Sequence, residues 1–261
     1  MILISTVRKQ FVTPASTLLL MLAFALISGC ASKKSLYPTQ KKEVQTKAPN
    51  QDVTEKKRRF FDFMRPVIVA ENNAVMKQRK KVQKLQARHD AGHKLSRRDQ
   101  VWLRDLASAY SLKQNDFSSD NFWRGLLMRV DTVPVELALA QAANESSWGR
   151  SRFAREGNNY FGQWCYSKGC GLVPRERKEG AGHEVAAYAS ANESVRNYIH
   201  NLNTTRAYSK LRQLRFNARQ AGKQASAISL ANGLDKYSSR GKAYVQDIQS
   251  MIRTNRDLMT S

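Results

Sequence analysis

The sequence predicts a mainly α fold with one small β element, preceded by a basic helical region. Apolar residues recur at helical spacing between Phe60 and Tyr110, and helical patterning returns in three segments after Tyr188. Residues 137–144, LALAQAAN, carry no charge on any side, which is typical of a helix that is buried all round. Aromatic residues, two cysteines, several glycines and a proline lie between Tyr160 and Tyr188. This composition favours a short antiparallel hairpin.

Residues 1–29 are predicted to be an export signal. Arg8 and Lys9 precede the uncharged run TLLLMLAFALISG, whose apolar part is about half of the roughly 20 residues that a membrane-spanning helix needs. The stretch LISGC resembles the bacterial lipobox, in which the cysteine, here Cys30, is acylated and becomes the new N-terminus. The alternative is a plain secretory signal that a cysteine follows by chance.

The residues after the cysteine predict where the chain is held. Ala31, not an aspartate, follows Cys30, which by resemblance to lipoproteins of double-membrane bacteria favours an outer-membrane anchor facing the periplasm. The acyl chains would hold the protein at that membrane without a spanning helix. Residues 30–56 are polar and contain prolines, so we expect the acylated cysteine to be followed by a flexible tether.

The chain is strongly basic, with 44 lysines and arginines against 21 acidic residues. Such a balance would normally suggest nucleic acid as a partner, but the predicted export argues against it, so none is expected. The excess is greatest upstream of residue 131 and includes a basic helical region expected over residues 57–119. An anionic wall or lipid surface would attract this region. A solvated basic face without a specific partner is the alternative.

Cys165 and Cys170 are the two cysteines that follow the lipobox, and four residues separate them. An even pair at this spacing in an oxidising compartment predicts a disulfide across a tight hairpin. A metal site would need two more ligands, and the four histidines show no ligand spacing around the pair. No metal is therefore expected.

Glu145 stands at the C-terminal end of the predicted buried helix, which begins near Pro134 and is expected to end with Gly149 as its C-cap. Burial and the negative end of the helix dipole both disfavour ionisation of a carboxyl group at that place. A retained proton is what a general acid needs when it protonates the oxygen of a departing sugar. The alternative is a structural glutamate bonded to a nearby amide or arginine.

The segments AQAANESSWGRSRFA and NNYFGQW resemble the glucosaminidase family of peptidoglycan hydrolases, glycoside hydrolase family 73. In that family a glutamate at a helix end is followed closely by Trp-Gly and then by an Asn-x-Phe-Gly turn. Glu145, Trp148, Asn159 and Phe161 occupy these positions here. Further segments, FGQWCYSKGCGLVPRER and LDKYSSRGKAYV among them, are similar to the Bax protein group within the family. The resemblance covers residues 120–257.

The resemblance implies a lysozyme-like α+β catalytic domain with a small hairpin lobe over residues 120–261. It implies an endo-β-N-acetylglucosaminidase that hydrolyses the glycan strands of peptidoglycan without a cofactor, with Glu145 as the catalytic acid. The segment that begins YASANESVRNYI resembles the family's Tyr-x-Ser, helix and distal Tyr pattern, which carries over to Tyr188 and Tyr208. Tyr208 would line the cleft and orient water or the sugar's acetamido group; ordinary helix packing is its alternative.

An inverting glycosidase also needs a second carboxylate, roughly 6.5 to 9.5 Å from the acid, to activate water. Glu176 is the candidate and Glu179 its competitor. The family's lobe often carries this glutamate after a threonine, whereas Arg175 precedes Glu176 here, so the match is imperfect. Assistance by the acetamido group of the substrate would remove the need for either carboxylate.

The candidate substrate-binding residues are Trp148, Asn159, Phe161, Trp164 and Tyr188. Aromatic rings suit the apolar faces of sugars, although most aromatic side chains of this region are expected in the core. The tryptophan of the hairpin lobe is the best candidate for exposure in the cleft.

Two other functions remain open. A lytic muramidase or transglycosylase of related fold would break the other glycosidic bond of the strand. A catalytically silent, wall-binding lipoprotein scaffold would use the basic helical region as its functional part.

Overall fold

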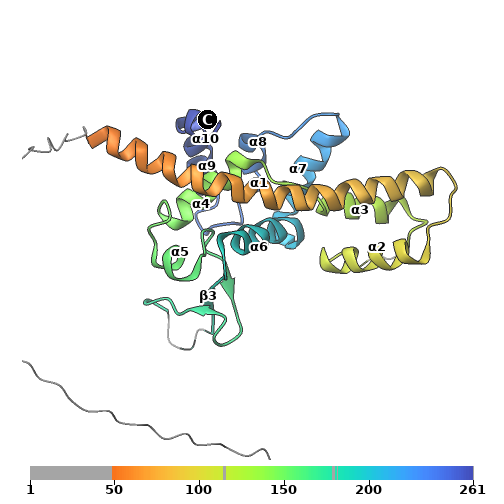
Figure 1. Ribbon diagram of the computed structural model, residues 1–261, viewed down its shortest axis with the longest axis horizontal. Coiled ribbons are helices and arrows are strands. Elements are labelled where there is room, and N and C mark those ends of the chain that lie inside the picture. Colours follow the sequence, from red (N-terminus) through yellow and green to blue (C-terminus); the bar gives the residue numbers. More distant parts are fainter. Residues whose placement is uncertain (1–48, 114–115, 178–179, 181, 261) are drawn as a thin grey trace, which may run out of the picture. The chain divides into compact units, whose positions relative to one another are not determined.

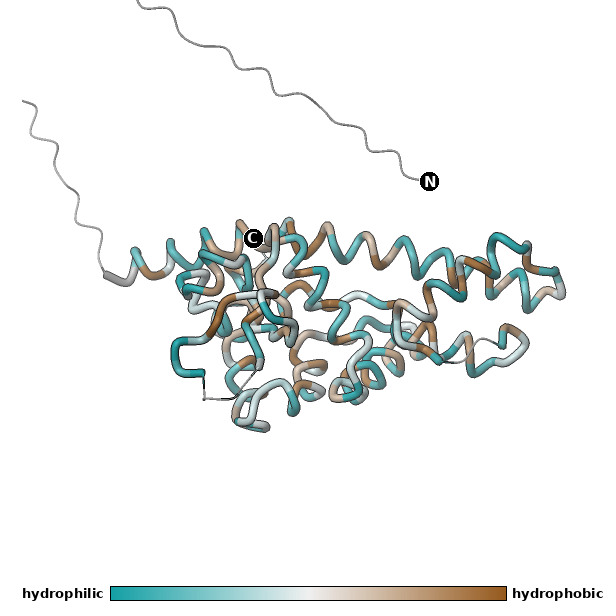
Figure 2. The backbone as a smooth tube through the Cα atoms, turned by 90° about the horizontal axis from the view of Figure 1, so that it is seen from below, coloured by the Kyte–Doolittle hydropathy of each residue, from teal (hydrophilic) through white to brown (hydrophobic). Residues whose placement is uncertain are grey.

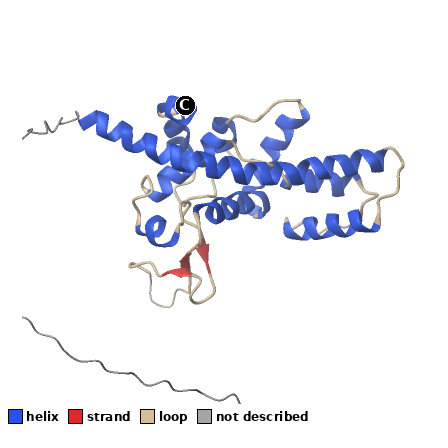
Figure 3. Ribbon diagram, viewed as in Figure 1, coloured by secondary structure: helices blue, strands red, loops and turns tan. Residues whose placement is uncertain are grey.

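The computed structural model describes residues 49–113, 116–177, 180 and 182–260, and most of them are helical (Figure 1 and Figure 3). A small three-stranded sheet accompanies the helices, so the expected mainly α, lysozyme-like class with a β lobe is confirmed. The predicted export signal, Cys30 and the first part of the tether lie outside the described residues. Among the helices that are described, none is both long and apolar enough to cross a membrane.

Helix α1 (Pro49–Asp90) is 42 residues long and begins earlier than expected. Residues 49–56, assigned to the tether from their polarity, form its first turns. Ion pairs between Asp52 and Lys56, and between Glu55 and Arg59, stabilise these exposed turns at i,i+4 spacing. Hydrophobic and hydrophilic residues alternate along the helix (Figure 2), and its buried residues recur at helical spacing, so one face is buried.

Two hydrophobic cores share α1. Phe61, Met64 and Ile68 belong to the larger core, which contains α4 and most of the C-terminal helices. Val82 and Leu85 belong to a smaller core with α2 (Arg97–Ala109) and α3 (Asp120–Arg129). We call the C-terminal half of α1 with α2 and α3 the arm. Because the arm's core draws on both sides of residue 120, the expected division between a basic region and a catalytic domain runs through a single packed unit.

The middle of helix α4 (Val135–Ser146), residues 137–143, is buried all round, as the charge-free stretch 137–144 predicts. The helix contacts α1, α8, α9 and α10. The expected C-cap at Gly149 is wrong, because the helix ends at Ser146 and Ser147 adopts the left-handed conformation that closes it. The remaining helices are α5 (Arg152–Gly157), α6 (Ala191–Thr204), η1 (Arg206–Tyr208), α7 (Ser209–Gln220), α8 (Ala227–Ala231), α9 (Lys242–Thr254) and α10 (Arg256–Thr260).

The sheet consists of β1 (Trp164–Cys165), β2 (Gly171–Leu172) and β3 (Glu184–Ala186), antiparallel and in the order β1-β3-β2. The predicted disulfide between Cys165 and Cys170 is confirmed, with 6.2 Å between the Cα atoms. The strands beside the two cysteines do not form the simple hairpin that we expected, because each pairs with β3, which lies between them.

The carboxylate of Glu184 holds the loop between the two cysteines. It accepts hydrogen bonds from the backbone N–H groups of Gly169 and Gly171, at 3.0 and 2.8 Å, which lower the pKa of Glu184. The carboxylate lies within 4.8 Å of the two cysteine sulfurs, a grouping that could suggest a metal site. The sulfurs are bonded to each other and the carboxylate is occupied by N–H donors, so this cluster does not fit a metal ion.

Candidate active site

Glu145 is the penultimate residue of α4, and its side chain is half-buried. Its Oε1 atom accepts a hydrogen bond of 3.2 Å from Nδ2 of Asn144. A loop over residues 159–163 passes beside the carboxyl group, where a Cβ atom at Gly162 would lie 3.4 Å from Oε2 of Glu145. Gly162 has a φ of +63°, which favours glycine. The carboxyl group therefore sits between a helix end and a tight loop, only partly shielded from solvent.

Four tyrosines surround this carboxyl group. They come from α6, η1, the turn before α9, and α9 itself, and they are Tyr198, Tyr208, Tyr237 and Tyr244. Burial is the largest cause of the raised pKa of each phenol, and the negative charge of Glu145 contributes to all four. All four phenols therefore keep their protons at neutral pH and remain hydrogen-bond donors.

A row of hydrogen bonds lies behind Glu145. The hydroxyl of Tyr198 donates to Oε1 of Gln141 at 2.7 Å, and Nε2 of Gln141 donates to the hydroxyl of Tyr244 at 2.9 Å. The Tyr244 hydroxyl lies near Glu145, whose negative charge contributes to the raised pKa of that phenol. Gln141 is 0% exposed, so it cannot exchange these partners for water. The row therefore fixes the position of the Tyr244 hydroxyl near the carboxyl group.

The sequence reasoning missed four residues of this site: Gln141, Tyr198, Tyr237 and Tyr244. A signal existed for one of them, because Gln141 is one of the two polar residues within LALAQAAN and precedes Glu145 by one helical turn. Tyr208 was expected in the cleft, and the structure does bring it into the cluster, 5.8 Å from Tyr237 between ring centroids.

Asn159 and Phe161 were expected to bind substrate, but the structure gives them a supporting role. Asn159 is 2% exposed, and its amide makes four hydrogen bonds with the backbone of residues 161, 163 and 186. Phe161 is equally buried and stacks on Tyr198 at 3.9 Å between centroids, while its carbonyl accepts a hydrogen bond from Tyr237. Both residues shape the loop beside Glu145 and do not present their side chains to solvent.

Trp148 also lies near Glu145 but faces the core in part. Its half-buried ring packs edge-on against Phe60 and Phe61 of α1, at 5.9 and 5.3 Å between centroids. The ammonium group of Lys57 lies 5.2 Å from the ring centroid. The upstream helix therefore supports the segment that follows Glu145, a contact that the sequence did not predict.

The lobe carries the remaining candidates. Trp164 is 58% exposed and stacks on His183 at 4.2 Å between ring centroids, so one side of its ring is covered. Tyr188 is half-buried, and its hydroxyl donates to Oε1 of Gln163 at 3.0 Å; burial raises its pKa to about 12. Glu176 lies exposed in a turn after β2, and within the described residues no hydrogen bond or ion pair joins it to Glu145. Glu179 lies outside the described residues.

Comparisons with known proteins identify the family of the chain. Residues 124–257 match the glucosaminidase family model, whose description is mannosyl-glycoprotein endo-beta-N-acetylglucosaminidase. Protein bax of Escherichia coli (strain K12) is 31% identical over 208 residues, which are 80% of this chain and 73% of that protein. No solved structure matches the chain. The chain therefore belongs to the glucosaminidase family of glycoside hydrolases, as a protein of the Bax type.

Proposed function

We propose that the protein is an endo-β-N-acetylglucosaminidase that hydrolyses the glycan strands of peptidoglycan, with Glu145 as the general acid. The observation that carries this proposal is the placement of the carboxyl group at the end of buried α4, beside Gly162 and among protonated phenols. Membership of a glycosidase family supports the reaction class. The export signal expected from the sequence supports peptidoglycan as the substrate, because an exported chain meets the wall.

In the proposed reaction, Glu145 gives its proton to the oxygen that joins N-acetylglucosamine to the next sugar. The bond between C1 and that oxygen breaks, and a water molecule adds its oxygen to C1. The proton that the water loses passes to a base. We propose Glu176 as that base; the alternative is the acetamido group of the substrate, with which Tyr208 could form a hydrogen bond.

The residues packed beside Glu145 keep its carboxyl group in place for the reaction. Tyr244 is held by Gln141 and by stacking on Tyr237, at 5.4 Å between ring centroids. Its hydroxyl, placed near Glu145, would hold the carboxyl group in one orientation and leave the other side free for the substrate. A fixed general acid avoids reorganisation in the transition state.

The lobe is the proposed sugar-binding wall. The exposed area of Trp164 and the half-buried ring of Tyr188 are suited to the apolar faces of sugar rings. The disulfide between Cys165 and Cys170 limits the movement of the segment that carries Trp164. Trp148, packed against α1, would contribute to binding at its exposed edge.

We also propose that Cys30 is acylated and anchors the protein in the outer membrane, facing the periplasm. The support for this location is the LISGC stretch in the sequence, together with a disulfide in the folded chain. Growth with a radiolabelled fatty acid should label the wild-type protein and leave Cys30→Ser unlabelled. Labelling of both proteins would contradict the assignment of Cys30.

The deciding experiment incubates the form that lacks residues 1–30 with purified peptidoglycan, followed by borohydride reduction and mass spectrometry. We expect fragments that end in reduced N-acetylglucosamine. Glu145→Gln should release them about 10²- to 10⁴-fold more slowly. Glu156→Gln, an exposed glutamate on α5 paired with Arg152, is the matched control and should behave as the wild type.

Other products would support the other functions. Fragments that end in muramic acid or its anhydro form would replace the proposal with a muramidase or a lytic transglycosylase. Wall binding without any fragments would favour the scaffold. Glu176→Gln separates the two routes for water, because a loss comparable to that of Glu145→Gln supports Glu176 as the base, whereas retained activity supports the acetamido group.

A further inference from the structure

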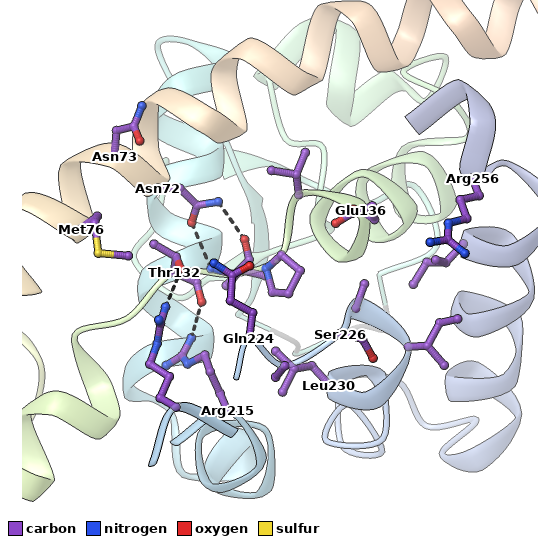
Figure 4. Close-up of a pocket in the computed structure, with 18 of the residues that line it drawn as sticks. Asn72, Asn73, Met76, Thr132, Glu136, Arg215, Gln224, Ser226, Leu230 and Arg256 are labelled. Carbon is purple, nitrogen blue, oxygen red and sulfur yellow. Dashed lines mark hydrogen bonds between the residues drawn. The ribbon is translucent and has the colours of Figure 1, made fainter. Parts of the chain in front are cut away.

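A cavity of about 680 Å³ lies at the end of α4 that is opposite to Glu145. Its walls come from α1, the turn before α4, α7, α8 with the loop before it, and the α9–α10 junction (Figure 4). This volume is within the range of pockets that bind small organic molecules. Its lining residues are separate from the tyrosine cluster around Glu145.

The cavity has an excess of positive charge. Arg215, Arg219, Arg253 and Arg256 line it, and Glu136 is the one carboxylate among the described lining residues. Arg219 is neutralised, because it forms two hydrogen bonds of 2.6 Å with buried Asp131 just behind the wall. Arg215 and Arg79 share that same aspartate, at 3.5 and 3.4 Å. The single negative charge of Asp131 is therefore shared by three guanidinium groups, so the net charge around the cavity is positive.

Several donors of this cavity have no partner within the part of the chain that the structure describes. The guanidinium groups of Arg253 and Arg256 form no hydrogen bond or ion pair there, and both side chains are exposed. Arg215, by contrast, is 3% exposed and is bound within the protein, because its terminal nitrogens donate hydrogen bonds to three backbone carbonyls and to Oδ1 of Asn203. The N-terminus of α4 also meets the cavity at Pro134, without a capping side chain. Its free N–H groups add positive potential.

The other lining residues suit a larger organic molecule better than a simple inorganic anion. Ile228, Leu230 and Ile252 form an apolar wall, and Gln224 and Ser226 offer groups that can pair with amides. Figure 4 shows Arg215 and Arg256 at opposite sides of the cavity, with Gln224 and Ser226 between them. Carboxylates of an extended molecule could therefore be bound by the exposed Arg253 and Arg256, while its small apolar groups lie against the apolar wall and its amides near Gln224 and Ser226.

We propose that this cavity binds a short acidic peptide, of the kind that peptidoglycan carries as stems on its glycan strands. Such stems combine free carboxylates, amides and methyl side chains. The choice of this peptide rests on the proposed function, because that function makes peptidoglycan the substrate. The cavity would hold the wall by its peptides while the other end of α4 acts on the sugars.

The test measures binding of the stem peptide, released from purified peptidoglycan by an amidase, to the full chain in detergent by titration calorimetry. We expect the double variant Arg253→Gln/Arg256→Gln to weaken the Kd by about tenfold or more. The matched control is Arg97→Gln/Arg98→Gln, which removes two exposed charges at the start of α2 and should change the Kd less than about twofold. Unchanged thermal unfolding of both variants checks that they fold.

Three outcomes would overturn the proposal: no binding by the wild type, equal binding by both double variants, or displacement of the peptide by inorganic phosphate at similar concentration. Because the peptide contains no sugar, the result is independent of glycan cleavage. Peptide binding by a chain that releases no sugar fragments would keep this inference and refute the enzyme. Cleavage without peptide binding would refute this inference and keep the proposed enzyme.

Discussion

The change of Gln141 to leucine tests the buried row of hydrogen bonds behind Glu145. Leucine removes the 2.7 Å bond from Tyr198 and the 2.9 Å bond to Tyr244, and it leaves two buried hydroxyls with unmet hydrogen-bonding capacity. Each such group costs about 1–3 kcal/mol, and the nearby carboxylate of Glu145 offers the Tyr244 hydroxyl another acceptor, so we expect a total loss of about 2–4 kcal/mol. At about 2–4 °C per kcal/mol for a domain of this size, the Tm should fall by roughly 5–15 °C.

Urea unfolding followed by circular dichroism measures this loss, with Gln249→Leu as the control. Gln249 also makes two hydrogen bonds, but these bonds lie at the surface, where water can replace them, so its replacement should cost under about 0.5 kcal/mol. Adding Tyr198→Phe to Gln141→Leu should cost less than the sum of the two single changes, because no unpaired hydroxyl remains at that position. A Gln141→Leu protein as stable as the wild type, or strict additivity, would refute the reasoning.

Three further changes test other parts of the structure. Replacing Cys165 and Cys170 with serine should destabilise the protein by about 2 kcal/mol, since the closed loop is short, and thermal unfolding with and without reductant should show no difference once the cysteines are gone. Asp131→Asn should destabilise by about 3–5 kcal/mol in urea unfolding, because it leaves three buried or half-buried arginines without their shared carboxylate; a loss below about 1 kcal/mol would contradict this ion-pair account. The pKa of Glu184 is lowered in the folded state, so its contribution to stability is present above about pH 4 and is lost as the pH falls through the lowered pKa. Unfolding curves of Glu184→Gln should therefore lack that acid-side decline, and an identical decline in both proteins would count against it.

Features set by local sequence were predictable. The absence of charge in LALAQAAN identified α4 as a buried helix, and the placement of Glu145 at its end followed from counting along that segment. The disulfide followed from an even pair of cysteines in a chain predicted to be exported. In each case the signal lies within a few neighbouring residues, so the sequence carries it.

Features set by contacts between distant segments were not predictable. Tyr198 and Tyr244 reach Gln141 from α6 and α9, and no pattern within any one of these segments indicates that they meet. The strands are two or three residues long, too short for alternation to show that β3 lies between the other two. The start of α1 was missed for a related reason. Its polar first turns resemble a tether, whereas burial of Phe60 and Phe61 just downstream favours the helix.

Helix α1 runs without a break between the two cores, so the number of residues between them sets how one core is rotated about the helix axis relative to the other. One inserted residue would turn everything downstream by about 100° and advance it by about 1.5 Å. An insertion between Ile68 and Val82 would therefore leave both cores with their own residues but twist the arm around the axis of α1. Seven inserted residues, close to two full turns, would nearly restore the original facing. The residue count between Ile68 and Val82 thus sets the direction in which the arm points relative to the cleft.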